Sequence, residues 1–254
     1  MSQKHKNRSE SCSLIHKNGS YLLYNPHLLT SPDSNLLYSG IFQKSDNYRP
    51  VVAGGRGQAW FVEINGLSTV YRRYMRGGLM SRINQQTYFG LRQEDSRSIK
   101  EWRLLQLMLE LDLPVPRPIA ASVTRWPFRF SPFYRAQILV ELIPDVQVLD
   151  QILSQRVLTS EEWGLVGKCI RRFHNEGIYH ADLNANNILL NDLSAVYLID
   201  FDKSEIRSVK TTGEVWMEAN LQRLKRSLLK QQSIHKLYHF TENNWQTLIA
   251  AYTE

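Results

Sequence analysis

One polar motif, with two short apolar stretches after it, constrains the fold of this chain more than any other feature. The motif reads His180-x-Asp182-Leu-x-x-x-Asn187, and Asp200 ends the second apolar stretch thirteen residues after Asn187. Apolar stretches of this length predict short strands, so the polar side chains are expected where the chain turns between them. Carboxylate and amide oxygens are the ligands that Mg²⁺ prefers, and a carboxylate can also take a proton from a hydroxyl group.

The spacing matches the signature of protein kinases, His-Arg-Asp-Leu-x-x-x-Asn followed by Asp-Phe-Gly. Phosphoryl transfer needs a carboxylate near the acceptor hydroxyl and oxygen ligands for Mg²⁺ on the phosphates of ATP. Asp182 would supply the first, and Asn187 and Asp200 would supply the second. Taken singly, each of these residues is common in ordinary turns. The composite at this spacing favours the kinase interpretation.

The residues before the motif predict a β-rich half with one helix. Apolar stretches predict strands at 51–53, 59–64, 69–74, 119–123 and 136–142. Asn65-Gly66 is a two-residue hairpin signal between the second and third strands. An apolar stripe predicts a helix over 96–111, which the following prolines end. Residues 1–50 are polar and rich in turn signals, so we expect an extension packed on this half.

The remaining residues predict a mainly helical half. Thr159 and Glu162 form a capping box that opens a helix, and Gly177 stands where its C-terminal cap belongs. Short strands are expected at 188–190 and 196–199, and two closing helices at 214–230 and 243–252. The fold class is therefore α+β, with two lobes as in protein kinases and a reduced C-lobe. We place the N-terminal extension at 1–50, the N-lobe that covers the nucleotide at 51–143, and the C-lobe with the catalytic, metal and acceptor sites at 144–254.

A nucleotide-binding turn is expected between the first two of these strands. Gly54, Gly55 and Gly57 would let backbone N–H groups approach phosphates, although a simple glycine-rich turn explains them equally well. No Gly-x-x-x-x-Gly-Lys-[Ser/Thr] motif occurs, which excludes a P-loop enzyme.

A cationic side chain is expected to orient the phosphates from the third strand. Arg72 takes the position of the kinase lysine, and Glu101 on the following helix is its expected ion-pair partner. Strand alternation puts Arg73 on the opposite face, and both Arg73 and Arg76 are close enough to be alternative phosphate ligands. A solvated charge on an edge strand is the alternative for Arg72.

The overall charge predicts an anionic partner. The 254 residues carry 31 Lys and Arg against 24 Asp and Glu, a net charge of +7. Basic residues concentrate at 72–103 and 223–230. These stretches could form a solvated face or a surface that meets anionic lipid. No nucleic-acid motif and no obligatory protein partner are evident. The sequence has only two cysteines, no apolar run of membrane-spanning length and no signal peptide. We therefore expect a protein on the cytoplasmic side, with only peripheral membrane contact.

The arginine-rich run from Arg72 to Gly78, the glycine-rich turn and His180-Ala-Asp182 together resemble the 3-deoxy-D-manno-octulosonic acid (Kdo) kinase family, over about residues 50–205. That family is related to the lipopolysaccharide core heptose kinases and, more distantly, to protein kinases. The resemblance implies ATP-dependent phosphorylation of the 4-hydroxyl of Kdo on a lipid A precursor, at the cytoplasmic face of the inner membrane. It implies Asp182 as catalytic acid/base, Asn187 and Asp200 as metal ligands, and Arg72 with Glu101 as the phosphate-orienting pair.

The chain departs from the kinase pattern, and three alternatives stay open. Asp202 replaces the Gly of Asp-Phe-Gly, Arg72 replaces Lys, and Ala181 replaces the usual Arg. The enzyme could phosphorylate another core sugar such as heptose. Asp200-x-Asp202 could be the metal site of a glycosyltransferase, and a kinase-like binding module without activity is the third possibility.

Overall fold

The computed structural model describes residues 12–30, 32–33, 36–37, 49–51, 59–74, 88–90, 92–192 and 195–254. These residues belong to two compact units. The first unit comprises Met1–Glu110 and Arg117–Leu142, and the second comprises Leu111–Pro116 and Ile143–Glu254. The roles expected for the two lobes, nucleotide covering by the N-lobe and catalysis by the C-lobe, stay predictions.

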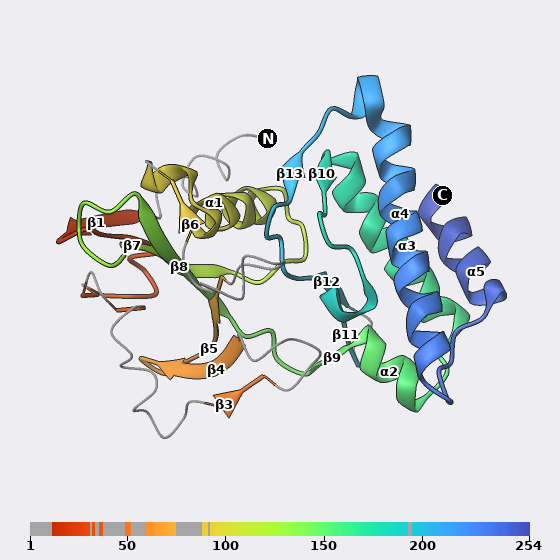
Figure 1. The fold of residues 1–254 in the computed structure, drawn as a ribbon. Helices are drawn as coiled ribbons and strands as arrows, with labels where there is room; N and C mark the ends of the chain where they lie inside the picture. The colour runs from red at the N-terminus through yellow and green to blue at the C-terminus, as the bar shows by residue number, and fades with distance from the viewer. Residues whose placement is uncertain are drawn as a thin grey trace, which may run out of the picture. The chain divides into compact units, whose positions relative to one another are not determined.

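The first unit is built on one antiparallel sheet, with a helix packed on it (Figure 1). Its strands are β1 (Ser13–Lys17), β2 (Ser20–Tyr24), β3 (Arg49–Pro50), β4 (Ala59–Ile64), β5 (Leu67–Arg73), β6 (Tyr88–Phe89), β7 (Pro118–Arg125) and β8 (Phe133–Glu141). They run in the order β1-β2-β7-β8-β5-β4-β3, and β6 pairs with β8. A 3-10 turn (Gln93–Asp95) leads into helix α1 (Arg97–Glu110). The hydroxyl of Ser98 donates to the carbonyl of Ser122 at 2.9 Å, which ties α1 to β7.

The predicted hairpin between β4 and β5 is confirmed. Asn65 and Gly66 have φ angles of 51° and 75°, both in the left-handed region. A two-residue turn of this kind matches the twist of the flanking strands, and asparagine and glycine tolerate its backbone best. The predicted helix over 96–111 and the pair of strands that follows it are also confirmed.

The expected extension over 1–50 differs from the structure where the structure describes it. Residues 13–24 form β1 and β2, and β2 pairs along its length with β7 inside the sheet. Leu22 of β2 is fully buried, in a core cluster with Tyr71 and Leu139. Strand β2 is stabilised by long-range pairing and by burial of its side chains, neither of which local composition reports.

The second unit is mainly helical. Its helices are α2 (Leu149–Gln155), α3 (Ser160–Asn175), α4 (Val209–Ile234) and α5 (Glu242–Thr253), with a 3-10 turn at Ala185–Asn187. Strands β12 (Val196–Leu198), β11 (Ile188–Asn191) and β9 (Val146–Val148) form one small sheet, and β10 (Ile178–Tyr179) pairs with β13 (Glu205–Ile206). Within the described ranges, no helix has both the length and the hydropathy needed to cross a bilayer.

Helix α3 begins and ends as its sequence predicts. The Thr159 side chain accepts from the backbone N–H of Glu162, whose carboxylate accepts from the N–H of Thr159 in return. Gly177 follows the helix with φ of 72°, a conformation that glycine adopts without strain. The same helix lies very close to α5: a Cβ added at Gly167 would stand 2.3 Å from the carbonyl oxygen of Leu248.

We expect Gly167→Ala to destabilise the fold, because the added methyl group would push α3 and α5 apart. The cost should be about 2 kcal/mol or more, as for other overpacked sites. Gly164→Ala is the matched control on the same helix, since its Cβ would meet Ala251 at an ordinary 3.6 Å. That variant should be neutral or up to about 1 kcal/mol more stable, because alanine favours helix. Urea unfolding measures both, and equal stabilities would contradict the prediction.

Candidate active site

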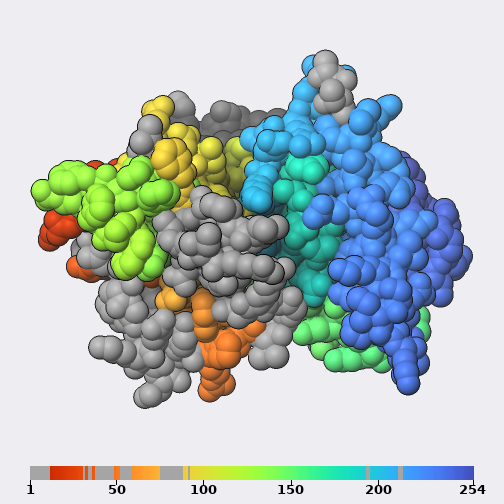
Figure 2. Space-filling view, in the orientation of Figure 1, coloured from red at the N-terminus to blue at the C-terminus, as the bar shows by residue number. Residues whose placement is uncertain are grey.

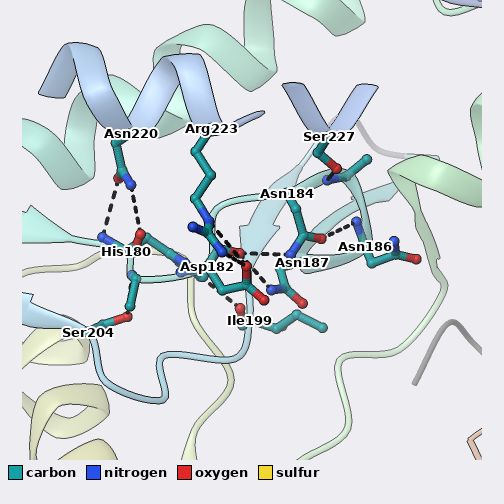
Figure 3. Close-up of polar contacts among 12 residues, drawn as sticks. His180, Asp182, Asn184, Asn186, Asn187, Ile199, Ser204, Asn220, Arg223 and Ser227 are labelled. Atoms are coloured by element: carbon teal, nitrogen blue, oxygen red, sulfur yellow. Dashed lines mark hydrogen bonds and ion pairs between the residues drawn. The ribbon is translucent and has the colours of Figure 1, made fainter. Parts of the chain in front are cut away.

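The loop from His180 to Asn187 is held in place by the buried ring of His180 (Figure 3). Its Nδ1 accepts a hydrogen bond from the backbone N–H of Asp182 at 3.1 Å, so its Nε2 carries the proton and donates to the carbonyl of Ile199 at 2.9 Å. Burial lowers the pKa of His180, which keeps the ring neutral, and its two hydrogen bonds select this tautomer. The ring also packs on Phe201, with centroids 4.7 Å apart. One side chain therefore connects the 180–187 loop with the end of β12.

Asn187 and Asp200 are brought together by the pairing of β11 with β12. The backbone N–H of Ile199 donates to the carbonyl of Asn187 at 3.0 Å, which places the next residue, Asp200, beside the loop. The Asn187 side-chain amide donates to the carbonyl of Asp182 at 2.9 Å, so its oxygen is the side-chain atom left to act as a ligand. Asp200 has φ of 63°, a conformation that costs energy outside glycine and is concentrated at functional sites.

One face of α4 contacts the same loop at three successive points. Asn220 accepts from the N–H of His180 at 3.3 Å and donates to its carbonyl at 2.7 Å (Figure 3). Arg223, nearly one turn further, donates through Nε to Oδ1 of Asp182 at 3.2 Å and also through Nη2. Ser227 accepts from the N–H of Ala185 at 3.5 Å. The three helix residues follow an i, i+3, i+7 spacing, so they share one face.

The position of Asn220 is itself supported from α3 and α5. The ring of His174 contacts the Asn220 side-chain oxygen through Nε2 at 3.2 Å and the Tyr252 hydroxyl through Nδ1 at 2.8 Å. Because the amide oxygen can only accept, Nε2 donates and Nδ1 accepts. Burial lowers the pKa of His174 to about 4. The neutral ring therefore joins three helices to the 180–187 loop.

Arg223 is a site residue that sequence reasoning misses, because in the sequence it is only one of several basic residues at 223–230. Its guanidinium pairs with Asp182, and both side chains are about half exposed. Lys225 of the same stretch pairs with Glu242 at 2.8 Å and lies over the ring of Trp245. Two basic residues of the 223–230 stretch thus have partners within the second unit. The helical spacing between Asn220 and Arg223 points to Arg223 only once the contact of Asn220 with the 180–187 loop is known.

In the first unit, Arg72 and Glu101 form the predicted ion pair. The Glu101 carboxylate, which is buried, accepts from Arg72 on one oxygen and from the Tyr74 hydroxyl on the other. Arg72 and Tyr74 alternate along the chain with Arg73, whose Nε donates to the Tyr71 hydroxyl at 2.9 Å on the other face. Burial raises the pKa of Tyr74, so its hydroxyl stays protonated and donates. The role of Arg72 toward a phosphate stays a prediction.

The structure describes only some of the other residues predicted to bind phosphate or metal. Gly54, Gly55, Gly57 and Arg76 lie outside the described residues. Among those described, no three His, Cys, Asp or Glu side chains gather in a way that could hold a metal ion. Asn187 and Asp200 offer an amide oxygen and a carboxylate. This small donor set fits Mg²⁺, which keeps several waters and is held by one or two carboxylates together with substrate phosphates.

Comparisons with known proteins agree with this geometry. Residues 44–252 match the lipopolysaccharide kinase (Kdo/WaaP) family. The chain is 38% identical over 227 residues to the 3-deoxy-D-manno-octulosonic acid kinase of Mannheimia succiniciproducens, with 87% of this chain and 91% of that protein covered. It is 41% identical over 192 residues to the enzyme of that name from Xylella fastidiosa, with 74% of each chain covered.

The chain belongs to the lipopolysaccharide kinase (Kdo/WaaP) family. A solved structure titled "WaaP in complex with acyl carrier protein" shares its fold, with a TM-score of 0.51 and 15% identity over 86% of this chain and 85% of that one. The expected α+β, kinase-like fold is therefore confirmed. Membership of this family favours the kinase interpretation of Asp200 over the Asp-x-Asp site of a glycosyltransferase.

The buried His174 predicts a loss of stability in mild acid. Its ordinary pKa of 6.5 falls to about 4 in the folded chain, so the unfolded chain binds more protons between these values. The stabilisation is complete above pH 6.5 and is lost as the pH falls toward 4, by up to about 3 kcal/mol. His174→Gln should reduce the slope of unfolding free energy against pH by up to one proton. Equal slopes in urea titrations would contradict this role.

Arg223 is expected to matter for activity and little for stability. A half-exposed ion pair contributes at most about 1 kcal/mol, so Arg223→Ala should unfold close to the wild-type temperature. If Asp182 acts on the acceptor, losing the group that orients its carboxylate should lower kcat about tenfold. Arg223→Lys should recover part of the rate because the charge returns. Arg226→Ala, an exposed arginine of the same helix, is the control; identical kcat in all of these variants would show that the pair has no catalytic role.

Proposed function

We propose that this protein transfers the γ-phosphoryl group of ATP to the 4-hydroxyl of Kdo. The Kdo acceptor is carried on a lipid A precursor in lipopolysaccharide core biosynthesis. Two relatives carrying the name 3-deoxy-D-manno-octulosonic acid kinase, at 38% and 41% identity, support the acceptor. The observation that carries the reaction type is the loop in which His180 and Asn187 hold the backbone on either side of Asp182.

The side chains of the second unit supply the groups that phosphoryl transfer requires. The Asp182 carboxylate is half exposed, so an acceptor hydroxyl can reach it and give up its proton. Asn187 and Asp200 would hold Mg²⁺, which neutralises charge on the phosphate oxygens when it is bound. The His180 ring binds the backbone at Asp182 and at Ile199, next to Asp200, which holds the backbone positions of the two carboxylate residues.

The first unit supplies a candidate phosphate ligand. Arg72 is held by Glu101 and lies beside the ring of Tyr74, 5.4 Å from its centroid. A guanidinium is always charged and its planar fork matches the geometry of phosphate oxygens, so Arg72 is the proposed phosphate ligand. Glycines 54, 55 and 57 are proposed as backbone ligands on the strength of their sequence alone.

We further propose that the protein works peripherally, on the cytoplasmic face of the inner membrane. Its acceptor would be anchored in lipid, and a net charge of +7 favours contact with anionic headgroups.

A single assay tests the proposed reaction. The full chain is incubated with labelled ATP, Mg²⁺ and a Kdo-bearing lipid A precursor, and mass analysis looks for one added phosphate. Fragmentation of the product locates the phosphate on Kdo or elsewhere. A heptose-bearing core acceptor without Kdo runs in parallel, and transfer to that acceptor alone would overturn the proposed substrate.

Asp182→Ala should lower turnover by about 10²–10⁴-fold, because removal of a general base typically costs that much. ATP binding should change little, since this carboxylate contacts the acceptor. Asp192→Ala is the matched control, because Asp192 is an exposed carboxylate in the turn after β11. Near-wild-type turnover by Asp182→Ala would show that the 180–187 loop is not the catalytic loop.

A further inference from the structure

A loop joins β7 to β8 at one end of the sheet in the first unit (Figure 1). Several phenylalanine side chains in this loop and on the strands beside it are exposed. Phe128 and Phe130 in this loop are 61% and 78% exposed. Phe89 of β6 and Phe133 of β8 are exposed register partners whose ring centroids lie 5.9 Å apart. Groups of large apolar side chains exposed together mark surfaces that meet another apolar phase.

The exposure of these rings does not come from a loosely held loop. The N–H of Trp126 donates to the carbonyl of Phe133 at 3.0 Å and closes the loop at its base. The N–H of Ser131 donates to the carbonyl of Phe128 at 2.9 Å, and the Ser131 hydroxyl accepts from the N–H of Phe133 at 3.1 Å. The backbone is therefore ordered, and it directs Phe128 and Phe130 to the surface, where the yellow-green side chains of this segment stand out in Figure 2.

A basic hollow of ≈ 560 Å³ lies between this loop and the turn that joins β1 to β2. Lys17 of β1, Arg129 of the β7–β8 loop and Arg125 of β7 line it, and its described lining residues include no Asp or Glu. The two walls touch, since a Cβ added at Gly19 would lie 2.8 Å from Cα of Arg129. A hollow with this charge favours an anionic ligand.

Arg129 connects the hollow with the exposed rings. Its guanidinium lies 4.4 Å from the ring centroid of Phe130, which also lines the hollow. Within the part of the chain that the structure describes, neither Lys17 nor Arg129 forms an ion pair, so their charge is available to a ligand. Cations directly beside exposed aromatic rings match the headgroup region of a bilayer, where the rings meet acyl chains and the cations meet phosphates.

We propose that this hollow binds the phosphate-bearing headgroup of an anionic membrane lipid while Phe128 and Phe130 enter the bilayer interface. The aromatic–basic surface, defined by Lys17, Arg129, Phe128 and Phe130, then docks the protein on the membrane. A free phosphate ion would use the cations and leave the exposed rings unexplained. The inference rests on the proposed membrane location, and it is independent of the kinase reaction.

Cosedimentation of the full chain with vesicles tests the proposal. The vesicles contain equal parts of phosphatidylglycerol and phosphatidylcholine, and phosphatidylcholine alone is the neutral control. Phe128→Ser with Phe130→Ser should weaken binding about tenfold or more at low and at high salt, because apolar burial is not screened. Lys17→Ala with Arg129→Ala should weaken binding chiefly at low salt. Val157→Ser with Leu237→Ser removes two residues of similar exposure, 60% and 72%, from the second unit and should bind as wild type.

Each other outcome has a definite meaning. The proposal would be overturned in favour of the basic stretch at 223–230 by either of two results. Both double variants of the aromatic–basic surface could bind vesicles as wild type, or vesicle binding could be lost only when Arg226 and Lys230 are replaced. Inorganic phosphate or polyglutamate bound at the hollow, with vesicle binding unchanged in the variants, would assign it to a free anion or an acidic protein instead. Wild-type thermal unfolding shows that the variants fold. Unchanged phosphorylation of a short-chain, water-soluble acceptor would separate failed docking from failed catalysis.

Discussion

The side chain of Asn220 binds the backbone of His180 on both its N–H and its carbonyl, and the site in the second unit depends on this contact. The Asn220 side chain is almost completely buried, so each of its hydrogen bonds replaces one that water would otherwise make. Leaving one buried polar group without its partner costs about 1–3 kcal/mol. Since His174 holds the same amide from α3, a shift of the 180–187 loop would break contacts on two helices at once.

The same helix then determines what surrounds Asp182. Once Asn220 sets the rotation of α4 about its axis, Arg223 faces the Asp182 carboxylate and Ser227 faces the next part of the loop. Neither residue belongs to the motif that indicates kinase chemistry. The environment of the candidate base is therefore made in part by a helix that follows it by about forty residues in the chain.

In the first unit, the ion pair between Arg72 and Glu101 likewise fixes a strand through a buried polar group. Glu101 is buried, and its carboxylate accepts from Arg72 near the end of β5 and from Tyr74 two residues further along the chain. A buried carboxylate without such donors would be strongly unfavourable, so the pair also secures the register between the strand and α1. Arg73, one residue away, is directed to the opposite face and packs on Trp60 and Tyr71.

By itself, the sequence determined what depends on neighbouring residues. The Asn65-Gly66 hairpin and the Thr159 capping box were predictable because turn and cap preferences are local, and the 180–187 motif because the chemistry of phosphoryl transfer restricts residue type and spacing. Tertiary structure alone decided that β2 joins the sheet and that Arg223 pairs with Asp182. Both depend on contacts between residues far apart in the chain, whose free energy comes from burial and pairing that no local pattern encodes.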